Sequence, residues 1–340
     1  MAIKTIGIDL GKTVFVAVAL DGRGRLVGPA KRYGRTRLVR WLANLPPCLI
    51  GMEASSGAAH HLARTLQGQG HAVRLLPGQA VKPFRGAMKN DAADALAIAE
   101  AAHRPGLRPV PIKSAAQLDV QAIHRVRTQL VRERTALINQ VRGLLRERGI
   151  TVAQGPHRLA EALIELPGAP AAISATLGML LVRRRAAWRR LDAEIGELDR
   201  LLVDHARTDA RCRRLMTIPG LGPITATALV AAVDDGQAFA RARDLAAWLG
   251  LVPRQHTTGG RARLRGIAKG GNRYLRTLLV HGARALRRSR HVRSGRLGAW
   301  LAALETRAHS NKVTVALANK LARIAWAVLA KKEDYRVLPA

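Results

Sequence analysis

The chain has 340 residues, of which 57 are Lys or Arg and 23 are Asp or Glu, so its formal net charge is +34 at pH 7. A charge of this size repels itself unless a polyanion neutralises it, which makes nucleic acid the first partner to expect. Aromatic residues form only 3% of the chain, so phosphate contacts are expected to outweigh base stacking.

Cysteine usage and hydropathy favour a cytoplasmic protein. The two cysteines, Cys48 and Cys212, lack the spacing of metal ligands and predict reduced thiols. The N-terminus shows no signal-peptide pattern, and no apolar run has the length expected of a membrane span. We therefore expect a bacterial cytoplasmic protein that associates with the nucleoid when it binds DNA.

The segment 1–105 alternates strand and helix signals and predicts a mixed α/β domain. The predicted strands are Ile3–Asp9, Val14–Leu20, Arg25–Pro29, Cys48–Glu53 and Ala72–Leu76. The predicted helices are Leu38–Leu45, Ala58–Gln69 and Asp91–His103.

The segment 106–216 predicts a linker followed by a helical arm. Gly106 to Lys113 is proline-bearing and precedes a long helical stretch that ends near Arg148. A second long stretch covers about Ile173–Ala206, with Pro156, Pro167 and Pro170 between the two. Two long antiparallel helices fit a coiled-coil arm, but their apolar spacing is only roughly heptadic, so an ordinary helical bundle fits equally well.

The segment 217–340 predicts a mainly α-helical C-terminal domain. Its helices are expected at Ile224–Val233, Asp244–Leu249, Asn272–Arg288 and Asn311–Leu329, with a loop at Val252–Gly266. The turn from Ile218 to Pro223 has a Pro-Gly-x-Gly pattern typical of a helix-hairpin-helix, whose backbone amides can hold a phosphate. The alternative is a helix–turn–helix corner that serves packing alone. Leu245–Leu304 contains many basic residues and no Asp or Glu.

Four carboxylates in three short motifs are the main candidates for chemistry. Asp9 and Glu53 each end an apolar run that predicts a buried strand, while Asp91 and Asp94 are three apart and share one helical face. Acids that converge from separate elements usually hold hard cations, and a Mg²⁺ pair is the common device for phosphodiester chemistry. The residues predict two bound Mg²⁺ ions.

Each acid taken alone also has a structural explanation. Asp9, in its Gly-Ile-Asp-Leu-Gly-Lys context, also fits a phosphate loop of actin-like sugar kinases. Glu53 can be an exposed strand end, and Asp91 and Asp94 can be dipole-favoured charges at a helix N-terminus. The order strand, strand, helix matches the metal site of an RNase H-like nuclease. The net charge, and the lack of a good second glycine-rich loop, disfavour a kinase.

A second constellation lies in Gly250–Arg261, where Thr257 and Thr258 adjoin two glycines and several arginines. A hydroxyl presented there can attack a phosphodiester and hold the strand covalently. A phosphate-binding loop without covalent chemistry is the alternative. Basic residues expected to contact nucleic acid are Arg254, Arg261, Arg263, Arg265, Lys269, Arg273 and Arg276.

Together these motifs resemble the DEDD insertion-sequence transposases, the bridge-RNA-guided recombinases. The resemblance rests on the four acids, the Pro-Gly-x-Gly helix, Gly250–His256, Lys269–Arg276 and His281–Ala285. It extends from Ile6 to about Leu329.

The resemblance implies a RuvC-like, RNase H-like N-terminal domain in which Asp9, Glu53, Asp91 and Asp94 bind Mg²⁺. It implies a coiled-coil dimerisation arm, a C-terminal transposase domain with a nucleophilic serine, and a covalent link to DNA. It also implies donor and target DNA selected by a structured non-coding RNA, and an active site shared by subunits of a dimer or tetramer.

One position departs from the family pattern, because Thr258, preceded by Thr257, stands where the family has its serine. Threonine keeps the hydroxyl, but its extra methyl group restricts χ1 and crowds the approach to phosphorus. Three outcomes are open: Thr258 reacts, Thr257 substitutes for it, or the protein is slow or inactive. We select Thr258 as the predicted nucleophile, with Asp9, Glu53, Asp91 and Asp94 as its catalytic partners.

Two other functions remain as alternatives to RNA-guided recombination. A junction-resolving endonuclease would use the same metal site with water as the nucleophile. A catalytically decayed protein would bind nucleic acid without cleaving it.

Overall fold

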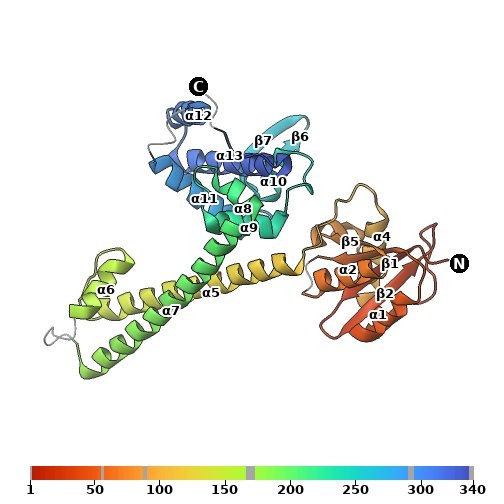
Figure 1. The fold of residues 1–340 in the computed structure, drawn as a ribbon, viewed down its shortest axis with the longest axis horizontal. Helices are drawn as coiled ribbons and strands as arrows, with labels where there is room; N and C mark the ends of the chain where they lie inside the picture. The colour runs from red at the N-terminus through yellow and green to blue at the C-terminus, as the bar shows by residue number, and fades with distance from the viewer. Residues whose placement is uncertain (1, 55–56, 87–89, 166–172, 290–294, 337–340) are drawn as a thin grey trace. The chain divides into compact units, whose positions relative to one another are not determined.

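The computed structural model describes residues 2–54, 57–86, 90–165, 173–289 and 295–336. The chain divides into two compact units, Met1–Ala116 and Gln117–Ala340. In Figure 1 the first unit runs from red to yellow-orange and the second from yellow to blue.

The first unit is built on a five-stranded sheet in the order β3-β2-β1-β4-β5. Its strands are β1 (Thr5–Leu10), β2 (Val14–Leu20), β3 (Lys31–Gly34), β4 (Leu49–Glu53) and β5 (Ala72–Leu76). The pairs β1–β2 and β2–β3 are antiparallel, whereas β1–β4 and β4–β5 are parallel. The predicted mixed α/β sheet is confirmed.

The third strand is the one element of this sheet that the sequence misplaced. The prediction was Arg25–Pro29, but β3 is Lys31–Gly34. The Asp21 carboxylate accepts from the backbone N–H groups of Arg23 and Arg25, at 2.8 and 2.9 Å, and this holds the chain in a turn. Gly28 then has φ +80°, which ends any extended run before β3 begins.

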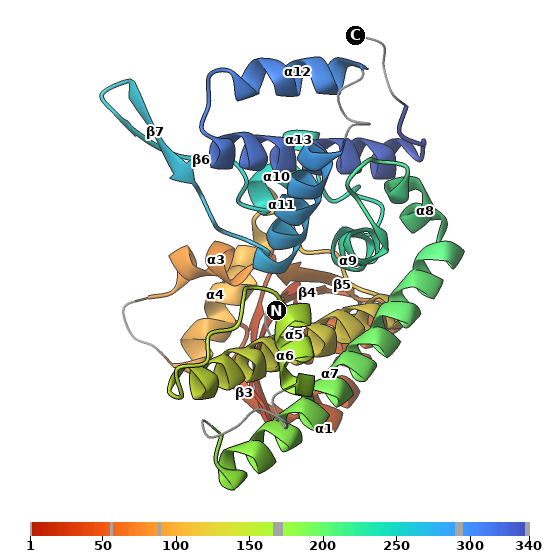
Figure 2. The same cartoon turned by 90° about the vertical axis from the view of Figure 1, so that its left-hand side faces the viewer.

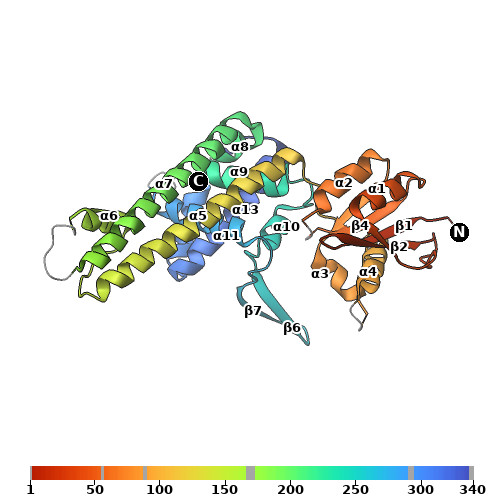
Figure 3. The same ribbon diagram turned by 90° about the horizontal axis from the view of Figure 1, so that it is seen from below.

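Helices cover both faces of this sheet (Figure 3). On one face lie α1 (Arg35–Ala43) and α2 (Ala59–Gly68); on the other lie α3 (Gly78–Val81), the 3-10 turn η1 (Lys82–Phe84) and α4 (Asp91–His103). The core under α1 and α2 contains Ile6, Ile8, Phe15, Leu38, Leu42, Ile50, Met52, Leu62 and Leu66.

Two glycines let α4 lie directly on the sheet. A Cβ at Gly7 would collide with the backbone of α4 at Ala95, and one at Gly51 would come within 2.6 Å of the Ala102 Cβ. Because α4 presents mainly alanines to the strands, helix and sheet approach more closely than larger side chains would allow. This contact fixes the first turn of α4 relative to β1.

In the second unit, two long helices run antiparallel as an arm (Figure 1). They are α5 (Ala115–Arg146) and α7 (Ala175–Thr208), and ion pairs Arg127–Asp199 and Arg134–Asp192 join them along their length. The sequence missed α6 (Pro156–Glu165), which packs beside α7. Pro156 was placed only in the segment between the two long helices, whereas it occupies the first position of α6, where proline is favoured.

A buried hydrogen-bond network attaches the arm to the C-terminal helices. The His124 ring on α5 lies 3.0 Å from both the Tyr274 hydroxyl and the Thr227 Oγ1. Thr227 donates its own proton to the Pro223 carbonyl at 2.7 Å, so His124 Nε2 donates and Nδ1 accepts. Burial lowers the pKa of His124 to about 4, with help from the nearby Arg127, and the ring is neutral at physiological pH.

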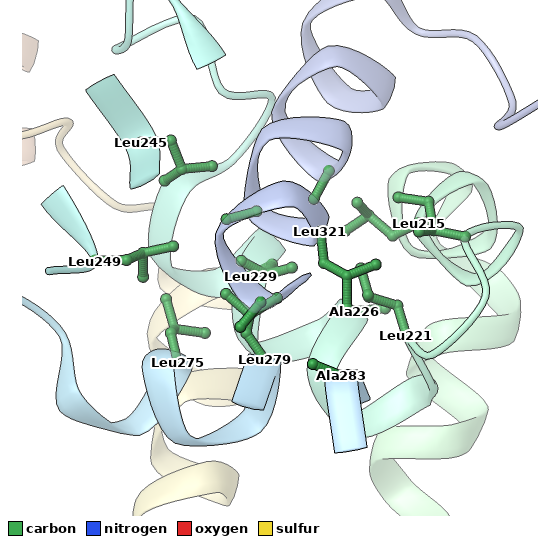
Figure 4. Packing of buried hydrophobic residues seen from close by; sticks show 14 of the residues in the cluster. Leu215, Leu221, Ala226, Leu229, Leu245, Leu249, Leu275, Leu279, Ala283 and Leu321 are labelled. Carbon is green, nitrogen blue, oxygen red and sulfur yellow. The ribbon is translucent and has the colours of Figure 1, made fainter. Parts of the chain in front are cut away.

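The C-terminal helices surround α13 (Ser310–Lys331), and Figure 4 shows Leu229, Leu279 and Leu321 meeting in their common core. The other helices are α8 (Ala210–Met216), α9 (Pro223–Val233), α10 (Ala242–Trp248), α11 (Arg273–Arg288) and α12 (Gly295–Glu305). The sequence predicted four of these six helices and missed α8 and α12. No apolar run long enough to span a membrane was expected, but α13 is long and apolar enough to do so. Many of its residues are buried among the other helices, so it is the core helix of this unit.

The Pro-Gly-x-Gly turn between α8 and α9 packs against α11. Gly220, at φ +88°, and Gly282 lie so close that a Cβ on Gly220 would be 2.9 Å from the Gly282 carbonyl oxygen. The flanking Ile218 and Leu221 are buried in the core. The geometry therefore explains both glycines by packing, while phosphate binding at this turn stays a prediction.

The prediction of a loop at Val252–Gly266 is wrong, because this segment forms a β-hairpin that protrudes from the helices (Figure 2). Its strands are β6 (Pro253–Thr258) and β7 (Arg261–Ile267). Gly259 and Gly260, with φ of +56° and +74°, form the two-residue turn between them. Two consecutive positive φ angles suit the turns that match strand twist in tight hairpins.

Candidate active site

Strand alternation places Asp9 and Glu53 on the α4 face of the sheet. In β1, Ile6 and Ile8 enter the core under α1 and α2, so Asp9 points to the opposite face. In β4, Met52 enters the same core, so Glu53 also points toward α4. The parallel register aligns Ile8 with Met52, which puts the two acids at adjacent strand ends.

The other two acids lie in the first turn of α4. The Asn90 side chain caps this helix by accepting from the Ala93 N–H at 2.8 Å, which fixes where the helix begins. Asp94 is mostly buried, with 14% of its side chain exposed, whereas Asp91 is exposed and pairs with Arg32 at 3.1 Å.

Arg85, directly after η1, bridges two of the four acids. Its Nη2 donates to Glu53 Oε1 at 2.6 Å, and its Nε lies 3.0 Å from Asp94 Oδ1. Gly78 lies beside the same Glu53 carboxylate, where a Cβ would be 3.2 Å from Oε2. A single guanidinium thus neutralises part of the acidic cluster.

The pKa of Asp9 responds to the other three acids, which lie within electrostatic range of its carboxylate. Burial raises its pKa, and the negative charges of Asp94, Asp91 and Glu53 raise it further, whereas Arg85 lowers it. Like charges at this range resist ionising together unless a cation offsets them. The donor set, all carboxylates, suits a hard divalent cation, and Arg85 stands in for that positive charge.

A different cluster also has ligand-like side chains, namely His205, Asp209 and Cys212 in the second unit. Asp209 already caps α8 through the N–H groups of Arg211 and Cys212, and it pairs with the Arg211 guanidinium at 2.6 Å. Burial raises the pKa of the Cys212 thiol to about 12, so it stays protonated. The contacts of this cluster serve the fold.

The hairpin register separates the two threonines. Thr258 pairs with Arg261 and His256 with Arg263, so these four side chains share one face of the ribbon. Thr257 lies on the other face, where its hydroxyl accepts from the Gln255 amide at 2.9 Å. The hydroxyl next to the cations is therefore that of Thr258.

The predicted nucleic-acid contacts fall into two groups. The exposed ones are Arg254, Arg261, Arg263, Arg265, Lys269 and Arg273. Arg276 is partly buried, and its Nη1 donates to the carbonyls of Leu249 and Gly270 at 2.8 and 2.6 Å. Arg276 therefore also holds the turn before α11.

Sequence reasoning missed Arg85 and Arg32, two cations that contact the acids within the described part of the chain. A basic residue six positions before an acidic helix start is a weak signal, because the ends of η1 and β4 meet only in the folded sheet. The contact of Arg32 with Asp91 could not be predicted, because the third strand was assigned to Arg25–Pro29 and Arg32 lay outside it.

The sheet order, with acids at the ends of β1 and β4 and in the first turn of α4, defines an RNase H-like domain of the DEDD class. A family model described as "Transposase" for the DEDD type matches residues 6–149, and one described as "Transposase IS116/IS110/IS902 family" matches residues 212–296.

Full-length relatives agree with both matches. The chain is 46% identical to a probable family 20 transposase of Pseudomonas aeruginosa, over 99% of each chain. It is 43% identical to the transposase for insertion sequence element IS1111A of Coxiella burnetii, covering 98% of this chain and 92% of that one. It is 42% identical to the IS1328 transposase of Yersinia enterocolitica, over 96% of each chain. The chain belongs to the IS110/IS116 family of transposases and is an enzyme of DNA recombination.

Proposed function

We propose that this transposase is an RNA-guided DNA recombinase that cleaves DNA with Mg²⁺ and exchanges strands through a covalent Thr258–DNA intermediate. The observation that supports it best is the convergence of Asp9, Glu53 and Asp94 on the Arg85 guanidinium, which marks a site built for positive charge. DNA substrates imply that the protein acts in the cytoplasm, at the nucleoid.

Asp9, Glu53, Asp91 and Asp94 would hold the metal, with two ions expected from the size of the set. Bound Mg²⁺ would polarise the scissile phosphate and stabilise the departing oxygen. Arg85 would have to leave Glu53 and Asp94 to free their oxygens, and a nearby DNA phosphate offers it a new partner.

The covalent step uses the second unit. The Thr258 Oγ attacks phosphorus, a new P–O bond forms, and the deoxyribose oxygen leaves and takes up a proton. His256 lies on the same hairpin face and is our candidate to receive the threonine proton. Arg261 and Arg263, also on this face, would neutralise charge that develops on the phosphate. Attack of the other strand's hydroxyl on the adduct reverses the step and joins the exchanged strands.

Self-association through the arm is supported by its exposed apolar side chains. Val182 is 60% exposed and Leu201 is 53% exposed, both on α7, and Val126 on α5 is 52% exposed. Exposed apolar side chains mark subunit contacts when they form a contiguous patch, and a second copy of the arm could join these three into one. We propose a coiled-coil dimer that pairs into a tetramer, so that a carboxylate site and a Thr258 hydroxyl meet on one DNA.

A guide RNA is the part of the proposal that rests on family resemblance and on the basic surface. The direct experiment is to purify the protein from cells that carry its whole element and sequence the nucleic acid that accompanies it. One discrete structured RNA supports guidance, whereas random fragments would show electrostatic binding only.

The catalytic part is tested with protein, that RNA and labelled DNA in Mg²⁺. We expect a protein–DNA adduct that survives denaturation, followed by joined product. Cleavage without adduct would instead identify a metal-dependent endonuclease that uses water, and binding without cleavage in Mg²⁺ or Mn²⁺ would identify a decayed enzyme.

A further inference from the structure

A groove of about 850 Å³ lies in the second unit, between the base of the β6–β7 hairpin and one face of α13. The hairpin contributes Leu264 and Arg265, and α12 contributes Trp300. Along α13, Lys312, Lys320 and Arg323 line the groove at helical spacing.

The charge of this groove has one sign. Of the described residues that line it, four are cations, Arg265, Lys312, Lys320 and Arg323, and none is Asp or Glu. Burial lowers the pKa of Lys320, and the positive charge of Arg323 lowers it further. An anion bound near both side chains would offset this repulsion and stabilise their charged forms. Phosphates are the anions that the established chemistry of this family brings to the domain.

The floor of the groove is apolar, which argues against a simple phosphate patch. Leu264 is 66% exposed, and Trp300 is only partly covered. The Lys320 Nζ lies 4.2 Å from the Trp300 ring centre, so the indole face points to the same cation that would meet a phosphate. If a bound phosphate moves the Lys320 ammonium group off the Trp300 ring, a base can stack on the exposed face of the indole.

Duplex DNA presents phosphates outward and keeps its base faces stacked inside. A strand with unpaired bases presents both phosphates and flat apolar surfaces, and proteins bind it with cations and aromatic rings together. Along β7, Leu264 is three residues from Arg261, the partner of Thr258, or about 10 Å, although Leu264 pairs with Gln255 and so lies on the other face of the ribbon.

We propose that this groove binds single-stranded DNA next to the cleavage point, with phosphates on Lys312, Lys320 and Arg323 and an unpaired base on Trp300. The inference rests on the proposed attack of Thr258 on DNA, because that step makes a DNA strand, rather than RNA, continuous with the groove. Such a pocket would hold the strand opened during exchange.

The test measures fluorescence anisotropy of labelled 12-nucleotide strands with full-length protein in the Thr258→Ala background, without Mg²⁺. Binding is then independent of the chemistry. The Lys312→Ala/Lys320→Ala variant should bind single-stranded DNA about tenfold more weakly, and its salt slope should be smaller by about 1.4, for two lost phosphate contacts. Its affinity for a 12-base-pair duplex should change by less than about twofold.

The matched control is Arg307→Ala/Lys331→Ala, which removes two exposed charges of the same domain outside the groove. Equal losses in control and groove variants would overturn the proposal, as would equal losses for duplex and single strand. An RNA strand of the same sequence that depends on the groove as strongly as DNA does would overturn the choice of DNA.

Trp300 is tested by photocrosslinking a strand that carries 5-iodouracil. Trypsin releases this residue in the peptide Leu297–Arg307, which contains no other Trp. We expect the adduct there, with Trp300→Phe retaining most of the binding; adducts only on other peptides would refute the base contact. If the groove binds as expected but wild-type protein gives no Thr258 adduct in Mg²⁺, the covalent function fails; single-strand binding by the groove is then retained, but its placement next to a cleavage point is overturned.

Discussion

Arg85 and Glu53 are joined by a 2.6 Å hydrogen bond in the middle of the acidic cluster. The same guanidinium contacts Asp94, so Arg85 competes with any metal ion for both carboxylates. In the proposed mechanism, a metal ion that used both carboxylates would therefore first have to displace this arginine.

Arg85→Ala should bind Mn²⁺ several-fold more tightly than the wild-type protein, because the competing cation is gone. Isothermal titration calorimetry in the absence of nucleic acid measures this directly. Arg23→Ala, at an exposed position outside the acidic cluster, is the control and should leave the affinity unchanged. Unchanged or weaker binding by Arg85→Ala would show that the arginine helps to assemble the site instead.

Asp9 should cost stability at neutral pH when no metal is bound. Its pKa is raised by burial and by the neighbouring acids, so the folded state holds a proton more firmly than the unfolded state. Stability is then lost as pH rises from the ordinary carboxyl pKa through the raised one. Asp9→Asn removes this loss and should raise the melting temperature at pH 7 by a few degrees, with a much smaller gain near pH 3.5. Calorimetry in EDTA provides the measurement; a gain that is the same at both pH values would contradict it.

The opposite orientation of the two threonines predicts a clear division of roles. Thr258→Ala should reduce adduct formation to background, whereas Thr257→Ala should keep it within a few-fold of wild type. Thr258→Ser should react faster, because it keeps the hydroxyl and loses the methyl group that restricts χ1. Gel detection of the protein–DNA adduct is the readout. Full activity of Thr258→Ala would refute the assignment.

Gly282→Ala should destabilise the C-terminal helices. Its new Cβ would collide with the backbone of Gly220, which cannot move away as a flexible side chain could. Overpacking of this kind usually costs about 1–3 kcal/mol. Gly196→Ala in α7 is the control, because its Cβ would meet no neighbour within 4 Å and alanine favours helix. Urea denaturation should move the two midpoints in opposite directions.

The neutral His124 predicts acid sensitivity of the second unit. Because its pKa is about 4 when folded and near 6.5 when unfolded, stability is complete above pH 6.5 and falls as pH drops toward 4. The loss is on the order of 3 kcal/mol, from about 1.4 kcal/mol per pH unit. His124→Gln should be less stable at pH 7 but should flatten this slope; an unchanged slope would assign the acid sensitivity to other groups.

Local patterns predicted the elements that carry the acids. The apolar runs before Asp9 and Glu53 predicted two strands that end at or next to these acids, and the helical run Asp91–His103 predicted α4 with its observed bounds. Arg85 could not be predicted, because its meeting with Glu53 depends on how η1 crosses the end of the sheet. What metal the acids bind, and whether they catalyse, remain predictions.

The hairpin shows a different limit of sequence reasoning. Gly259 and Gly260 were placed in a predicted loop, Val252–Gly266, although two adjacent glycines between alternating residues also favour a tight hairpin turn. Once the register was known, it separated Thr257 from Thr258, which the sequence alone had left open.

The two-residue turn of this ribbon has an evolutionary consequence. Side chains alternate with a period of two, so a one-residue insertion or deletion at Gly259–Gly260 that shifts the pairing would turn the hydroxyl away from its arginines. Such a change would preserve both threonines, the arginines and the net charge, yet on the proposed mechanism it would inactivate the transposase. If Thr258 is the nucleophile, activity therefore depends on the spacing across the turn as much as on the threonine itself.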